Sequence, residues 1–149
     1  MPDPFYSFTD VQTLSLKAGL YVVATPIGNL RDMTLRAMDT LAAADIVACE
    51  DTRVSGKLFQ ALGFKPKLMA YHDHNADEKR PYILSQIAVG KSVALISDAG
   101  MPLISDPGYK LVRDCLAAGV YVTSLPGANA PLMALQLSGL PSDHFSFLG

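Results

Sequence analysis

Five short apolar runs alternate with amphipathic stretches along this chain. The runs cover residues 20–25, 45–50, 67–72, 92–97 and 120–125. Apolar residues at helical spacing predict helices over 33–44, 53–63, 77–88, 109–119 and 130–137. Strands that are apolar throughout are typical of a parallel sheet covered on both faces. The pattern therefore predicts an α/β fold, with a five-stranded, mainly parallel, doubly wound sheet and helices on both faces.

Several residues mark the ends of the predicted helices. Asp32 stands where the helix over 33–44 needs an N-cap. Asp106, followed by a proline, has the pattern of an N-cap before the fourth helix. Gly63 is placed to end the second helix. Asn129 has two interpretations, since it can cap the last helix or hydrogen-bond the edge of a ligand ring.

The loops after the strands are the places to look for chemistry, because ligands bind outside the carboxyl ends of parallel strands. These loops read TPIGNLRD, EDTR, HDHN, SDAGMP and PGANA in chain order. The first lacks both glycine-rich patterns of phosphate-binding loops. A ligand without phosphate or a purely structural turn fits it equally well.

The stretch SDAGMPLISDPG, residues 97–108, carries two carboxylates. Because Asp106 is interpreted as a cap, the two are not expected to form a catalytic pair. Asp98 lies directly after a strand, so it is either a ligand contact or a turn residue that holds the loop. Gly100 lets the backbone approach a ligand closely.

The loops after the second and third strands carry charge. Arg53 and Lys57 lie four residues apart, which places two cations on one helix face. They form either a solvated surface or a contact for RNA phosphates. His72 and His74 point the same way in an extended chain and would suit a metal, but no third ligand accompanies them. No metal site is therefore predicted.

Length and composition fit one folded domain. The chain has 149 residues, of which 50% are hydrophobic and 17% are charged. Its 12 basic and 14 acidic residues are scattered and give a net charge of −2. This charge lacks the basic footprint of a self-sufficient nucleic-acid-binding protein.

Other features concern location. The two cysteines show no metal-type spacing, which is typical of a reduced, cytoplasmic chain. No apolar run approaches the length of about 18 residues that a membrane span needs. Residues 1–17 are acidic at the start, contain proline and are unlike a signal peptide, so we expect a flexible leader there.

Four motifs together resemble a known family. VATPIGNLRD, ACEDTR, SDAGMPLISDPG and SLPGANA occur in the order and spacing found in small-subunit ribosomal RNA (cytidine-2′-O)-methyltransferases of the tetrapyrrole (corrin/porphyrin) methylase superfamily. The resemblance covers residues 19–149. It implies S-adenosylmethionine as methyl donor, bound in a cleft between two domains, and usually a homodimer. It also implies a target in small-subunit ribosomal RNA, the ribose 2′-hydroxyl of a cytidine.

The resemblance also assigns residues and domains. Its cofactor contacts fall on Pro26, Ile27, Asp98, Gly100, Met101, Ala128, Asn129 and Ala130. The resemblance does not assign the remaining roles: from position, the proton acceptor would be Glu50, Asp51 or a group in the second domain, and Arg53 would contact RNA. Residues 18–143 would form the N-terminal cofactor-binding domain, and residues 144–149 would begin a second domain that is cut short. Because the second domain is cut short, the resemblance leaves open whether the fragment alone is active.

Three alternatives remain at this point. The first is a methyltransferase of the same superfamily that acts on a tetrapyrrole ring. The second is a phospho-receiver signalling module, whose fold is also doubly wound, although the acidic pair after its first strand is missing here. The third is a noncatalytic RNA-binding module, against which the lack of a basic surface and of an aromatic stacking motif weighs.

Overall fold

The computed structural model describes residues 15–149. The first 14 residues of the expected leader lie outside this range. Of the remaining three, Leu16 packs against the core. The Lys17 carbonyl accepts a hydrogen bond of 2.8 Å from the Tyr21 hydroxyl. Leu16 and Lys17 are therefore in contact with the domain.

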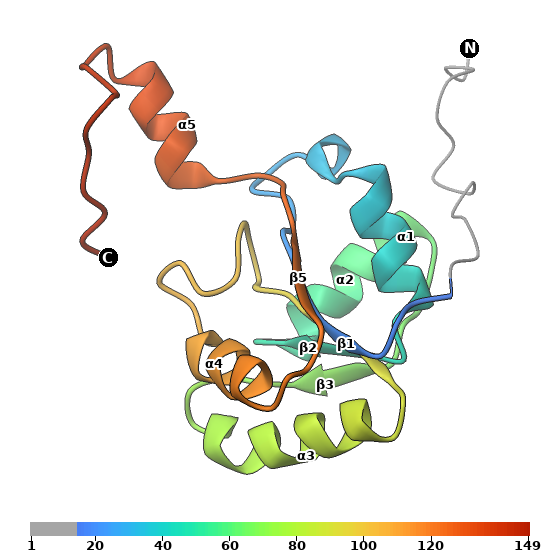
Figure 1. Cartoon of the computed structure of the whole chain (residues 1–149). Coiled ribbons are helices and arrows are strands. Elements are labelled where there is room, and N and C mark those ends of the chain that lie inside the picture. Colours follow the sequence, from blue (N-terminus) through green and yellow to red (C-terminus); the bar gives the residue numbers. More distant parts are fainter. Residues whose placement is uncertain (1–14) are drawn as a thin grey trace.

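A single parallel sheet forms the centre of the molecule (Figure 1). Its strands are β1 (Gly19–Val23), β2 (Ile46–Cys49), β3 (Leu68–Ala70), β4 (Ser92–Leu95) and β5 (Val122–Leu125). They lie in the order β3-β2-β4-β1-β5, and every neighbouring pair is parallel. The predicted five-stranded parallel sheet is confirmed.

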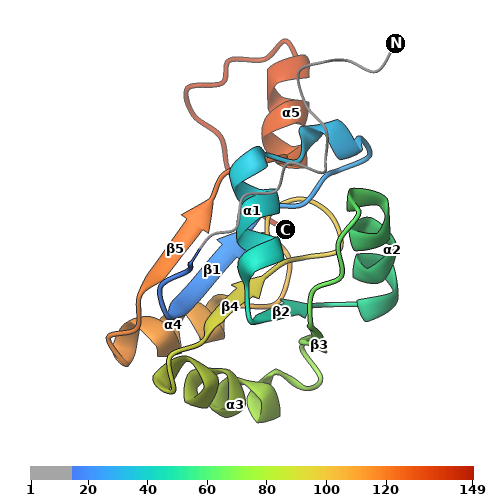
Figure 2. The same ribbon diagram turned by 90° about the vertical axis from the view of Figure 1, so that its right-hand side faces the viewer.

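Helices cover both faces of this sheet, as predicted (Figures 1 and 2). The elements are the short 3-10 helix η1 (Leu30–Asp32), α1 (Leu35–Ala43), α2 (Thr52–Leu62), α3 (Ala76–Ala88), α4 (Tyr109–Ala117) and α5 (Ala130–Leu137). One face carries α1 and α2, and the other carries α3 and α4. The last helix, α5, stands apart from the layers and buries none of its residues.

The central strands are largely apolar because they contribute to two cores. On β1, Tyr21 and Val23 pack towards α1 and α2, whereas Leu20 packs towards α3 and α4. On β4, Ala94 and Val93 divide in the same way. Side chains alternate between the faces of a strand, so a sheet buried on both sides needs an apolar residue at every position.

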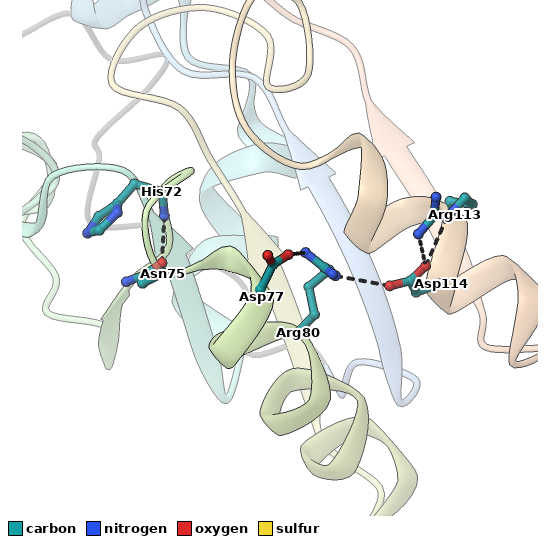
Figure 3. Close-up of polar contacts among 6 residues, drawn as sticks. All are labelled: His72, Asn75, Asp77, Arg80, Arg113 and Asp114. Carbon is teal, nitrogen blue, oxygen red and sulfur yellow. Dashed lines mark hydrogen bonds and ion pairs between the residues drawn. The ribbon is translucent and has the colours of Figure 1, made fainter.

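Arg80 fastens α3 to α4 (Figure 3). Its guanidinium donates to Asp77 on its own helix at 2.6 Å and to Asp114 on α4 at 3.0 Å. The Arg80 side chain is only 15% exposed, so this ion pair is partly shielded from solvent. The cross-link holds the beginning of α3, and with it the preceding loop, against α4.

Two predicted helix starts are wrong. Asp32 ends η1 instead of capping α1; the N-cap is Thr34, whose hydroxyl accepts the Ala37 N–H at 3.1 Å. The extra turn of 3-10 helix delays α1 by two residues beyond the expected start. Asp106 does not cap α4 either, because Gly108 occupies the N-cap position with φ 132° and no side-chain cap.

Two other predicted helix ends are confirmed. Gly63 follows α2 in the left-handed conformation, with φ 84°. Asn129 caps α5, since its Oδ1 accepts the Leu132 N–H at 2.9 Å. A cap that the sequence analysis missed is Asp51, which begins α2 by accepting the Arg53 N–H at 2.8 Å.

The strand order creates a crevice at the carboxyl edge of the sheet. β1 and β4 are neighbours, yet β1 leads to α1 on one face and β4 leads to α4 on the other. The connections from these two strands therefore lead to opposite faces of the sheet, which marks the topological switch point where ligands bind in open α/β sheets.

Candidate functional site

Backbone hydrogen bonds tie the loops after β1 and β4 together. Thr25 and Gly100 form an isolated bridge, with N···O distances of 2.8 and 3.1 Å. The Thr25 hydroxyl also donates to the Ser97 carbonyl at 3.2 Å. The two loops therefore form one continuous rim, although Thr25 and Gly100 are far apart along the chain.

Three loops meet at Gly100. A Cβ on this residue would lie 3.2 Å from Cγ2 of Ile27 and 3.7 Å from the Ala128 carbonyl oxygen. The backbone of Gly100 also has φ 81°, a conformation that side chains disfavour. Glycine thus permits the loops after β1, β4 and β5 to converge.

Met101 and Asn129 join the same rim. The Asn129 side-chain amide donates to the Met101 sulfur at 3.2 Å, while its oxygen caps α5. Ala130 follows as the first residue of α5. Six of the eight residues assigned to the cofactor, from Ile27 to Ala130, therefore lie on one rim; they are Ile27, Gly100, Met101, Ala128, Asn129 and Ala130.

The remaining two, Pro26 and Asp98, line an adjoining cavity of about 310 Å³. Lys57 of α2 lines it as well. The cavity lies between the loop after β1 and α2. The assigned residues therefore form one neighbourhood with two parts.

Asp98 lines a second cavity too, of about 460 Å³, at the carboxyl ends of β2, β3 and β4. Its Oδ1 accepts the Asp51 N–H at 3.2 Å, which pins the loop after β4 to the start of α2. Glu50, Arg53 and His72 are among the other residues of its wall. Asp98 thus has a structural role across two loops, in place of the local turn that was its alternative.

Carboxylates crowd this second cavity. Burial raises the pKa of Glu50, and the negative charges of Asp98, Asp106 and Asp73 raise it further, whereas His72 opposes them. Burial likewise raises the pKa of Asp106, with a contribution from Asp98, while a hydrogen bond from Ser97 lowers it. The charge of Asp98 therefore contributes to the raised pKa of Asp106.

Arg53 lies at the mouth of the cavity in an ion pair with Asp51. Its Nε and Nη2 donate to the carboxylate at distances down to 2.7 Å. These bonds lower the pKa of Asp51 to about 2. The Arg53 side chain is 87% exposed, so the pair presents a cation to solvent.

His72 and His74 lie side by side, with ring centroids 5.9 Å apart. Asn75 fixes this loop. Its Oδ1 accepts the His72 N–H at 2.9 Å (Figure 3), and its side-chain amide donates to the Ala70 carbonyl. The His72 Nδ1 is buried without a hydrogen-bond partner. Within residues 15–149, no group of three or more His, Cys, Asp and Glu side chains is arranged to hold a metal ion.

Comparison with protein families gives this geometry a context. Residues 19–147 match the family model of the Tetrapyrrole (Corrin/Porphyrin) Methylases. The chain belongs to this family. Membership agrees with the resemblance carried by the four motifs, and it separates the chain from the phospho-receiver modules.

Curated relatives carry a consistent name. A protein named Ribosomal RNA small subunit methyltransferase I from Mesorhizobium japonicum is 57% identical over 141 residues, which are 95% of this chain and 48% of that protein. A namesake from Rickettsia prowazekii is 54% identical over 134 residues, 90% of this chain and 48% of that protein. The chain spans about half the length of the curated relatives it matches.

Solved structures support the fold. Uroporphyrin-III-C-methyltransferase from Thermus thermophilus superposes with a TM-score of 0.63 at 24% identity, over 85% of this chain and 54% of that one. Its native form gives a TM-score of 0.59 at 26% identity, over 84% and 53%. In the part of the chain that the structure describes, no helix has both the length and the apolar character to span a membrane.

Proposed function

We propose that this chain is the S-adenosylmethionine-binding half of a methyltransferase that acts on a ribose 2′-hydroxyl, that of a cytidine in small-subunit ribosomal RNA. The observation that carries the proposal is the convergence of the loops after β1, β4 and β5 on one rim at the switch point. The names of relatives at 54–57% identity support the acceptor.

The residues of the rim fit this cofactor. Pro26 has no N–H and Ile27 is apolar, so this loop is poorly suited to a phosphate. S-adenosylmethionine has no phosphate but carries cationic groups, which a carboxylate at Asp98 would attract. Glycine and alanine around Gly100 leave room for a flat base. When bound, the cofactor supplies an electrophilic methyl group.

The remaining roles follow from position. The residues that would hold the adenosine are Pro26, Ile27, Gly100, Met101, Ala128, Asn129 and Ala130. Glu50 would accept the proton of the acceptor hydroxyl, because a carboxyl with a raised pKa is better matched to that task than an ordinary one. Arg53 would contact RNA backbone at the mouth of the cavity.

A second domain belongs to this proposal. The relatives are about twice as long as this chain, and α5 buries no residue. Leu137 and Leu148 are 88% and 95% exposed, which supports a further domain that covers them. A homodimer and a cytoplasmic location complete the proposal, with the small ribosomal subunit as partner.

The tetrapyrrole-ring alternative is less well supported by the charges of the site. Uroporphyrin-type rings carry several carboxylates. Glu50 and Asp98 line the cavity beside the rim and would repel such a substrate. A neutral ribose hydroxyl meets no such repulsion.

Calorimetry with S-adenosylmethionine and with S-adenosylhomocysteine tests the cofactor site. Asp98→Asn keeps an oxygen that can accept the Asp51 N–H but removes the charge. We expect this variant to bind S-adenosylmethionine about fivefold to tenfold more weakly, since one charge-assisted contact contributes roughly 1–1.4 kcal/mol. Its affinity for the uncharged thioether should fall much less.

Glu78→Gln is the matched control, because it removes the same charge from exposed α3. It should leave both affinities unchanged. If Asp98→Asn weakened the binding of both ligands equally, Asp98 would not interact with the positive charge of the sulfonium. No binding of either ligand to the parent chain would contradict the proposed function of this rim.

A further inference from the structure

The cavity of about 460 Å³ that Asp98 lines differs from the cofactor rim in the residues that form its wall. The cofactor rim is built from apolar and small residues after β1, β4 and β5. This cavity lies mainly after β2 and β3, with Asp98 from the loop after β4, and is otherwise lined mostly by polar residues that include Glu50, Arg53, His72 and His74. Its volume falls in the range of about 300–1,000 Å³ that small-molecule sites occupy.

The charges of the wall select the kind of group that can enter. Glu50 and Asp98 are carboxylates, whereas the charge of Asp51 is balanced by Arg53. A phosphate placed inside would face uncompensated negative charge. Hydroxyl groups would instead donate hydrogen bonds to the two carboxylates. The exposed guanidinium of Arg53 marks the mouth as the place for a flanking phosphate.

His72 lies in the wall of this cavity. Its backbone N–H is fixed by Asn75, which orients the residue (Figure 3). Its Nδ1 is buried and has no hydrogen-bond partner. A buried polar atom without a partner costs stability, and such atoms gather where a ligand is bound. Nε2, on the other edge of the ring, is the nitrogen that remains for a polar group in the cavity.

We propose that this cavity receives the ribose of the acceptor nucleotide and that His72 positions the sugar beside Glu50. The assignment rests on the proposed function, because it places the acceptor next to the cofactor rim through their shared residue Asp98. The 2′-hydroxyl donates to the Glu50 carboxylate, the imidazole of His72 hydrogen-bonds a neighbouring sugar oxygen, and Arg53 meets the adjoining phosphate.

The imidazole C–H resonances of the 149-residue chain give a direct test by nuclear magnetic resonance. The probe is a short single-stranded RNA with one central cytidine, compared with the same strand carrying 2′-deoxycytidine there. We expect the RNA to shift the His72 resonance saturably. His144 serves as the internal control, because it lies in the exposed terminal segment and should not respond.

Variants measure the two contacts. His72→Ala should weaken RNA binding about fivefold, the value of one hydrogen bond, whereas His72→Gln should recover part of the loss and His144→Ala should lose nothing. The parent chain should bind the RNA about fivefold more tightly than its 2′-deoxy form. Glu50→Ala should abolish most of that preference, whereas Glu50→Gln, which keeps an accepting oxygen, should retain part of it.

The outcomes separate the two proposals when S-adenosylmethionine affinity is measured on the same samples. If the cofactor binds but RNA leaves His72 unmoved, or does not bind at all, the acceptor cavity is wrong and the cofactor site stands. If RNA shifts His72 but the cofactor does not bind, the proposed function fails. A His72→Ala variant that loses cofactor as strongly as RNA would overturn the division into two sites.

Discussion

Glu50 is partly buried and lies near other carboxylates, and both features affect its pKa. Its pKa is raised by burial and by the carboxylates of Asp98, Asp106 and Asp73, and it is lowered by His72. Such an arrangement is unfavourable for folding and useful for proton transfer. Asp51 shows the opposite effect one residue later, since Arg53 lowers its pKa to about 2.

Glu50→Gln should stabilise the folded chain at neutral pH. The pKa of Glu50 is higher in the folded than in the unfolded chain, so ionisation opposes folding above the folded pKa, and the penalty is absent well below pH of about 4. The melting temperature of the glutamine variant should therefore exceed that of the parent at pH 7. The two should approach each other as the pH falls through the window between the unfolded and folded pKa values.

Thermal unfolding monitored by circular dichroism across this pH range measures the difference. Glu78→Gln on α3 provides a control that removes an exposed carboxylate. If the Glu50→Gln variant were less stable than the parent at pH 7, favourable interactions in the folded chain would stabilise the ionised carboxylate, and the prediction would be wrong.

At the scale of elements, the loop from β4 to α4 stands out by its backbone. Gly100 and Gly108 have positive φ, and so do Leu103 (72°) and Ser105 (61°), which are not glycines. Residues with side chains pay roughly 1–2 kcal/mol for the left-handed region, and such residues cluster at ligand sites. The loop is held in this shape by its bridge to Thr25 and by Asp98.

Gly108 tests this loop, and Gly56 in α2 is the matched control. Gly108→Ala should destabilise the chain by more than about 1 kcal/mol, because φ is 132° and the added Cβ would lie 2.7 Å from Cδ2 of Leu95. Gly56→Ala, inside α2 with open space around it, should stabilise by about 0.5–1 kcal/mol. Urea unfolding of both variants gives the comparison, and equal effects of the same sign would disprove it.

The sequence predicted which strands and helices are present more accurately than it predicted the residues at which the helices begin. Each of the five predicted strands and five predicted helices is present, because periodic burial leaves a local pattern. The cap rule succeeded at Asn129 and failed at Asp32 and Asp106. An inserted 3-10 turn and a glycine cap both depend on how the loop packs, which the local sequence does not state.

At the scale of the whole molecule, the sheet divides the interior into two cores. Cys49 lies in the core with α1 and α2, and Cys115 lies in the core with α3 and α4. Both thiols are buried. Burial raises the pKa of Cys49 and raises that of Cys115 to about 11. They are natural reporters of whether the two faces open together.

Neither thiol should react with a disulfide reagent in the folded chain at neutral pH, because the thiolate is the reactive form and access is blocked. In intermediate urea, both should react at the same rate, since one sheet supports both cores and its loss exposes both. Labelling of Cys49→Ser and Cys115→Ser variants, each with one thiol left, measures the two rates. A faster rate for one thiol would show that its helical layer opens by itself.

The residues of the site were named from the sequence, but their partners were not. Strand-end loops are recognisable because a parallel sheet places every carboxyl end on one edge. Which of those loops touch depends on the strand order β3-β2-β4-β1-β5, in which β4 separates β2 from β1. The bond between Asp98 and Asp51, across 47 residues, follows from that order.

The pattern of apolar and polar residues thus determined the strands, the helices and the layers they form, because each short segment shows by its apolar positions which of its faces are buried. The tertiary structure alone decided that Asp98 links two cavities and that Glu50 and His72 share one wall. Contacts of this kind arise from the packing of distant segments, whose combined energy no single stretch of sequence contains.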